Sequence, residues 1–156
     1  MREYSAYMVL DSAHTIASTL TARYALLWDD RRYDEWILLF VDGARFDWRG
    51  KIYEGRNAIQ RGIGSGNRAR PAGPGLHAMA NTIALADGEG SIKASSDFQF
   101  IAQRDGHNEC LFAGRLFDSI VATSDGWRFS RRCVRFLGDD GPDDWIRPWP
   151  PHDSNL

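Results

Sequence analysis

The chain has 156 residues and a mass of 17.6 kDa, so we expect residues 1–156 to form a single domain. Hydrophobic residues make up 43% and charged residues 26%, with a formal net charge of -2, which argues against disorder, a nucleic-acid-binding face or a polybasic membrane contact. No apolar stretch approaches the roughly 20 residues that span a bilayer, and the amino terminus does not resemble a signal peptide, so we expect a soluble, cytoplasmic protein.

Two helices are predicted at the start of the chain. Over residues 12–28, apolar side chains recur at spacings of three and four and form one stripe: Ile16, Leu20, Tyr24 and Leu27. Residues 33–40 fit a short second helix, because their apolar positions follow the same spacing.

A tight hairpin and a loop are predicted next. Residues 44–48 and 51–53 flank the pair Arg49-Gly50, and a two-residue connection with Gly is typical of a hairpin. Residues 55–63 fit a third short helix. Residues 64–75 contain four Gly and two Pro, so this stretch is predicted to be a loop, of a length often used for binding.

The rest of the chain is predicted to be β structure followed by an irregular tail. Residues 76–85, 90–103, 109–123 and 127–137 are rich in β-branched and aromatic residues, and three Asp-Gly turns separate them, which predicts an antiparallel meander. Their length indicates a bent sheet with bulges, and helices followed by strands indicate the α+β class. Residues 138–156 form the tail, whose tryptophans we expect to pack on the domain or on another subunit.

The aromatic content predicts an apolar pocket for a small hydrophobic molecule. The chain has six Trp, eight Phe and five Tyr, and period-two alternation places small and aromatic side chains together on one face of the strand over residues 90–103. The predicted apolar wall consists of Phe46, Trp48, Phe98, Phe100, Phe112, Phe117 and Phe136. Neither the two cysteines nor the histidines have the spacing of a metal site, so we expect no metal and no cofactor.

Several segments resemble one known superfamily. Residues 28–40 and 42–46, together with the strings at residues 77–81, 114–118 and 125–132, are similar to the SnoaL-like, nuclear transport factor 2-like superfamily. The resemblance is to scytalone dehydratase-like proteins and, more weakly, to β subunits of aromatic-ring-hydroxylating dioxygenases. It implies a curved antiparallel sheet that forms a cone, with helices enclosing an apolar pocket.

The resemblance to scytalone dehydratase implies a pair formed by Asp29 and His77. Periodicity alone favours Asp30, which lies on the stripe of Ile16 and Leu27, so Asp30 remains the alternative partner. A neutral imidazole held by a carboxylate can remove a proton from a carbon next to a carbonyl group, with the carboxylate fixing the tautomer. The alternative is that both residues are structural.

Further side chains are candidates for contact with the substrate. Tyr24 and Trp28 lie one helical turn apart and are expected near the mouth of the pocket. Asn81 alternates onto the same side as His77 and is expected to orient a hydroxyl group. Arg115, at a polar pocket position of the dehydratases, is expected to bind an anionic oxygen. The alternative for Arg115 is a salt bridge with Asp97 or Asp118 on a sheet face, and for Asn81 a structural amide contact.

Two functional hypotheses follow. The first is a cofactor-free lyase or isomerase that acts on a polyketide, terpenoid or aromatic compound, with His77 as base and Asp29 as its partner. The second is a non-catalytic ligand-binding or β-subunit-type assembly protein. Scytalone dehydratase has a tyrosine at the position of Trp28 and a second histidine near Ala102, and these differences argue against the same water elimination. Trp127, Phe129 and the tryptophans of the tail predict a homodimer or homotrimer, because few monomers expose so much apolar surface.

Overall fold

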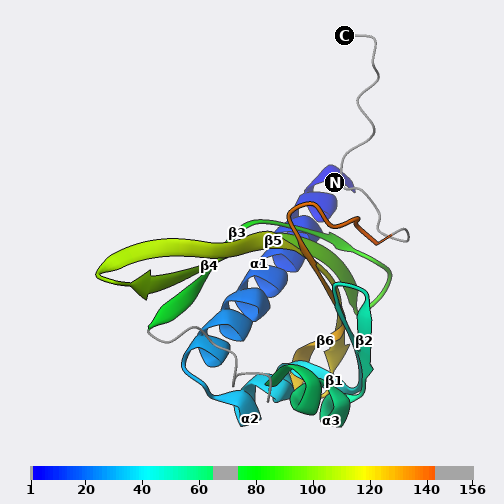
Figure 1. The fold of residues 1–156 in the computed structure, drawn as a ribbon. Helices are drawn as coiled ribbons and strands as arrows, with labels where there is room; N and C mark the ends of the chain where they lie inside the picture. Colours follow the sequence, from blue (N-terminus) through cyan, green and yellow to red (C-terminus); the bar gives the residue numbers. More distant parts are fainter. Residues whose placement is uncertain (1, 65–73, 143–156) are drawn as a thin grey trace.

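A long helix crosses the concave side of a curved, six-stranded sheet. The computed structural model describes residues 2–64 and 74–142, with side chains from residue 12 onward. The edge strands of the sheet, β2 and β3, do not pair with each other, so the sheet stays open (Figure 1). The predicted α+β class, with amino-terminal helices on a curved sheet, is confirmed.

The helices lie before the long strands, as predicted. They are α1 (Arg2–Asp29), α2 (Tyr33–Trp36), η1 (Ile37–Leu39), α3 (Arg56–Ile59) and η2 (Gln60–Gly64). The stripe of α1 that includes Leu20 and Tyr24 is buried, and α1 packs chiefly against β3. The second helix is shorter than predicted, because the backbone at Phe40 is extended and already begins β1. No described helix combines the length and apolar character needed to cross a membrane.

The strands form one sheet in the order β2-β1-β6-β5-β4-β3. They are β1 (Phe40–Trp48), β2 (Lys51–Glu54), β3 (Gly75–Ala86), β4 (Ser91–Arg104), β5 (His107–Thr123) and β6 (Gly126–Phe136). The strands β3 to β6 form the predicted antiparallel meander. The pairing of β1 with β6 is parallel and was not predicted, because these strands are far apart in the sequence.

Turns and bulges shape this sheet as the sequence suggested. Both Asp105 and Gly106 have positive φ, +48° and +80°, which is the backbone of a tight hairpin turn. Bulges interrupt the pairing between Ala80 and Ile83, between Phe100 and Ile101, and between Ser119 and Ile120. Such bulges bend strands and increase twist, so they account for the curvature around α1.

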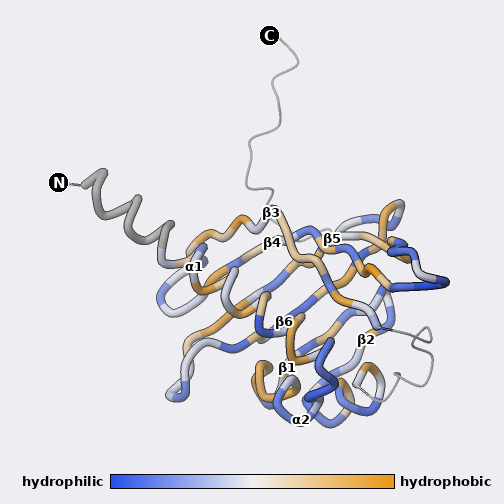
Figure 2. Tube along the Cα trace, turned by 90° about the vertical axis from the view of Figure 1, so that its left-hand side faces the viewer, coloured by the Kyte–Doolittle hydropathy of each residue, from blue (hydrophilic) through white to orange (hydrophobic). Residues whose placement is uncertain are grey.

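The core lies between α1 and the concave face of the sheet. Hydrophobic residues recur along the strands, while hydrophilic residues gather at the outer turns (Figure 2). Phe129 is completely buried in this core and Trp127 packs against it, so neither adds the exposed apolar surface expected of them. In the tail, the side chain of Asp139 binds Arg49 at 2.8 Å, but Trp145 and Trp149 lie outside the described residues, as does most of the predicted loop at 64–75.

Candidate active site

The carboxylate of Asp29 contacts His77 at two points. Asp29 is the last residue of α1, and His77 is the third residue of β3. Oδ1 of Asp29 lies 2.7 Å from the ring Nδ1 of His77, and Oδ2 accepts a hydrogen bond of 2.7 Å from the backbone N–H of His77. Asp30 is exposed to solvent instead. Of the two aspartates that the sequence left open, Asp29 is therefore the partner of His77.

This geometry depends on the position of β3 at the edge of the sheet. The backbone N–H of His77 is satisfied by Asp29, and the second carboxylate oxygen holds the ring of the same residue. An ionised carboxylate only accepts hydrogen bonds, so it requires the proton of a neutral imidazole to be on Nδ1. The lone pair of a neutral ring is then on Nε2, which is the arrangement that a general base needs. The side chains of His77 and Asp29 are only 14% and 12% exposed.

A row of aromatic rings extends from His77 across the concave face. We call His77, Phe100, Phe112, Phe136 and Trp48 the aromatic row. The ring of Phe100 lies 4.9 Å from that of His77, and each following pair of ring centroids is 5.1 to 5.4 Å apart. Phe98 joins the row from the same face of β4, and its ring lies 6.3 Å from Phe112. This apolar surface lies directly beside the imidazole.

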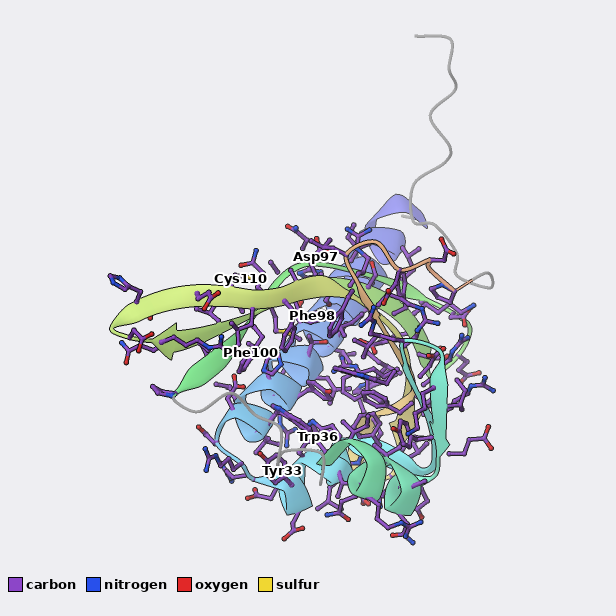
Figure 3. The ribbon with its side chains drawn as sticks, viewed as in Figure 1. Tyr33, Trp36, Asp97, Phe98, Phe100 and Cys110 are labelled. Carbon is purple, nitrogen blue, oxygen red and sulfur yellow. The ribbon has the colours of Figure 1, made fainter. Side chains whose placement is uncertain are left out.

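A second aromatic group joins α1 to α2. Tyr24 and Trp28 of α1 both contact the ring of Trp36, at centroid distances of 5.3 and 4.9 Å. Trp28 also contacts Tyr33, at 5.3 Å. Figure 3 shows Tyr33 and Trp36 at the α2 end of the concave side, below Phe98 and Phe100. Tyr24 is almost completely buried, and Trp28 packs against the same core, so their ring contacts are with the core and not with His77.

Three predicted site residues lie on the outer face of the sheet instead. Nε of Arg115 donates to Asp97 at 2.6 Å and Nδ2 of Asn81 donates to it at 2.8 Å, and the hydrogen bond from Arg115 lowers the pKa of Asp97. Phe117 alternates with Leu116 and Asp118, whose side chains are buried on the concave side. The structure does not bring these three residues to His77.

The placement of Asn81 and Arg115 has a local cause. The bulge between Ala80 and Ile83 breaks the alternation of β3, and Asn81 adopts a positive φ of 50° there. The prediction that Asn81 shares a face with His77 is therefore wrong. Arg115 forms the salt bridge with Asp97 that was the alternative prediction. Phe46, Trp48 and Phe98, in contrast, contribute to the core or its border as expected of the apolar wall.

A buried ion pair on the concave side was missed by the sequence analysis. Arg132 and Asp118 are both 0% exposed and form two hydrogen bonds of 2.7 Å. The guanidinium group lies 4.0 Å from the ring centroids of Tyr24 and Phe129, between α1 and the sheet. Burial raises the pKa of Tyr24 to about 12, so its phenol stays protonated. The sequence held one signal of this buried pair: Asp118 alternates in phase with the apolar residues Phe112, Leu116 and Ile120 along β5.

The described part of the chain gives no indication of a metal centre. Within residues 12–64 and 74–142, no group of three His, Cys, Asp or Glu side chains lies close enough together to hold an ion.

Comparisons with known proteins identify the family and the fold. A family profile described as a SnoaL-like domain matches residues 12–133. No curated protein matches the chain significantly. A nuclear transport factor 2-like protein with a cystatin-like fold from Novosphingobium aromaticivorans superimposes with a TM-score of 0.75, at 21% identity, over 90% of this chain and 92% of its own.

Two further structures from the same organism carry functional names. A protein provisionally named a scytalone dehydratase has a TM-score of 0.67 and 19% identity, over 78% of this chain and 82% of its own. The β subunit of a provisionally named aromatic-ring-hydroxylating dioxygenase has a TM-score of 0.68 and 16% identity, over 81% of this chain and 90% of its own. At these identities the likeness establishes the fold and leaves the reaction to the site itself.

Proposed function

The chain belongs to the SnoaL-like family, and from this premise we propose that it is a cofactor-free lyase or isomerase of the dehydratase-like kind. Its substrate is a small hydrophobic polyketide, terpenoid or aromatic compound. The observation that carries the proposal is the two-point contact of Asp29 with His77, because it leaves Nε2 of a neutral imidazole as the free base. The aromatic row beside His77 supplies an apolar wall for such a molecule.

The proposed reaction begins with proton transfer from carbon. Nε2 of His77 takes a proton from a carbon next to a carbonyl group, and the electron pair of the broken C–H bond forms an enolate. The enolate then either expels a leaving group at the next carbon or takes the proton back at a different position. Asp29 stabilises the imidazolium that forms, since its carboxylate lies 2.7 Å from Nδ1.

The experiment that tests this proposal needs no knowledge of the natural substrate. α-Tetralone in deuterated buffer exchanges the hydrogens next to its carbonyl group, and the exchange is followed by NMR. We expect the protein to accelerate this exchange above the rate of a matched imidazole buffer. A rate equal to that of the buffer would favour the non-catalytic alternative, a ligand-binding or assembly protein, which is supported by the shared fold of the dioxygenase β subunit.

Asp29→Asn is expected to reduce the exchange rate about a hundredfold, less than the loss of the histidine itself. The new amide can still accept the backbone N–H of His77, but its NH2 group donates to Nδ1 and moves the ring proton to Nε2. The rate is measured by the same NMR assay, with Asp30→Asn as the matched control because Asp30 is exposed. Equal rates for the two variants would contradict the role of Asp29.

Assembly into a homodimer or homotrimer is also part of the proposal. Among the described residues, no helix covers the outer face of the long strands (Figure 1), and Phe117 lies on that face. Burial of such a face in a second copy would remove apolar surface from water. Light scattering at micromolar concentration should give a mass two or three times 17.6 kDa. A mass equal to that of one chain would contradict this prediction.

A further inference from the structure

The three phenylalanines of the aromatic row form one stack across neighbouring strands. The ring planes of Phe100 and Phe112 differ by 13°, those of Phe112 and Phe136 differ by 6°, and both pairs of centroids are 5.1 Å apart. His77 contacts the ring of Phe100, so the orientation of the stack determines the wall beside the imidazole. At the other end of the stack, Phe136 is only partly buried, and its ring depends on its surroundings for a fixed orientation.

The guanidinium group of Arg49 covers this last ring. Its central carbon lies 4.6 Å from the ring centroid of Phe136, which is the geometry of a cation–π contact. Nε and Nη2 of Arg49 donate to the carboxylate of Asp139 at 2.8 and 2.9 Å, a two-point contact that suits the planar guanidinium group. The side chain of Arg49 is 47% exposed, so without this contact it would be free to leave the ring.

The backbone of Phe136 holds Asp139 in turn. Oδ2 of Asp139 accepts a hydrogen bond of 2.9 Å from the backbone N–H of Phe136, and the N–H of Asp139 donates to the carbonyl oxygen of Phe136 at 3.0 Å. The hydrogen bonds from Arg49 and from the backbone of Phe136 lower the pKa of Asp139 to about 2, so the carboxylate stays charged at neutral pH. The contacts therefore lead from the backbone of Phe136 through Asp139 and Arg49 back to the ring of Phe136.

The backbone at Arg49 gives independent support for a role of its side chain. Arg49 and Gly50 connect β1 to β2 with φ values of +52° and +93°, and two positive values are typical of a tight hairpin turn. Asparagine and glycine are favoured at the first of these positions, because a positive φ is costly for most other residues. Arginine is therefore unfavourable for the turn itself, and what it adds at this position is the guanidinium group over Phe136.

We propose that Arg49 is a positioning residue of the candidate active site, which fixes the aromatic row from the end that lies opposite His77. This inference rests on the proposed function for the identity of the site. Loss of the guanidinium group frees the ring of Phe136, and the rings of Phe112 and Phe100 then pack against a mobile neighbour. A flat ligand that packs on the row has to order these rings itself, which lowers its affinity. The reaction of the bound ligand is unaffected, because the base itself is held from α1.

Arg49→Asn separates this role from a role in the turn, because asparagine suits the turn better and removes the guanidinium group. The melting temperature should fall by no more than about 4 °C, since the ion pair is partly exposed. In the protein without ligand, the NMR signals of the ring protons of Phe112 and His77 should move, because the ring currents of their neighbours change. Arg32→Asn is the matched control, since Arg32 forms an exposed two-point contact with Glu35, at 2.8 and 2.6 Å, outside the row. Unchanged ring signals of Phe112 in Arg49→Asn would overturn the proposal.

Calorimetry and hydrogen exchange with α-tetralone test the effect on the ligand. Arg49→Asn should weaken binding of the ketone about fivefold or more, while the exchange rate at saturating ketone stays within about twofold of the original. Asp139→Asn should have the same effect, although it leaves Arg49 and the turn in place. Normal affinity in both variants, or an exchange rate that falls at saturation as well, would contradict the proposal. If the original protein bound no α-tetralone, the proposed function would fail, and the ring signals would still decide the role of Arg49.

Discussion

Replacement of His77 by Ala is expected to lower the exchange of α-tetralone hydrogens about a thousandfold, to the rate of the buffer. The imidazole that Asp29 holds through Nδ1 is the proposed proton acceptor, and alanine offers no ring nitrogen in its place. Ligand affinity should remain within a few-fold of the original, because a base contributes far more to the transition state than to ground-state binding. NMR gives the exchange rate, and calorimetry with the same ketone gives the affinity.

His107→Ala is the matched control for this variant. His107 is the first residue of β5 and is exposed, so its replacement should leave exchange unchanged. If His77→Ala retained the original exchange rate while it bound the ketone normally, the contact between Asp29 and His77 would be structural. If affinity and rate fell together, the substitution would have disturbed the apolar wall of the site, starting with the ring of Phe100 that contacts His77.

The course of the chain was largely predictable from local patterns. The apolar spacing around Leu20 and Tyr24, the turn at Asp105-Gly106 and the order of helices before strands each reflect interactions between residues close in sequence. The choice between Asp29 and Asp30 could not be made from such local patterns. Periodicity describes the buried stripe of a helix, but Asp29 is the last residue of α1, where the side chain is directed by its contact with β3.

The predictions for the strands failed where pairing departs from simple alternation. Asn81 was predicted to share the face of His77 because side chains alternate in a regular strand, but the bulge after Ala80 interrupts this alternation. Nothing local marks this bulge, since it depends on how β3 pairs with β4. The same limit applies to Arg49, whose contact with Phe136 depends on how β1 pairs with β6.

Replacement of one partner of the ion pair between Asp118 and Arg132 should cause a large loss of stability. Asp118→Leu leaves the guanidinium group of Arg132 buried and without a counter-charge, so we expect the free energy of unfolding to fall by about 3 to 5 kcal/mol. Denaturant unfolding followed by tryptophan fluorescence measures this change. Arg115→Gln breaks the exposed pair with Asp97 and should cost at most about 1 kcal/mol, because solvent already screens that pair.

The double variant Asp118→Leu with Arg132→Met tests whether the ion pair adds net stability to the fold. If the attraction between the two charges only offsets the cost of burying them, two apolar side chains of similar size should restore most of the lost stability. We expect this recovery, because the surroundings of Arg132 are the rings of Tyr24 and Phe129, against which a methionine packs well. A double variant as unstable as Asp118→Leu alone would mean that the ion pair stabilises the fold beyond its desolvation cost, through the contact of Arg132 with α1 at Thr21.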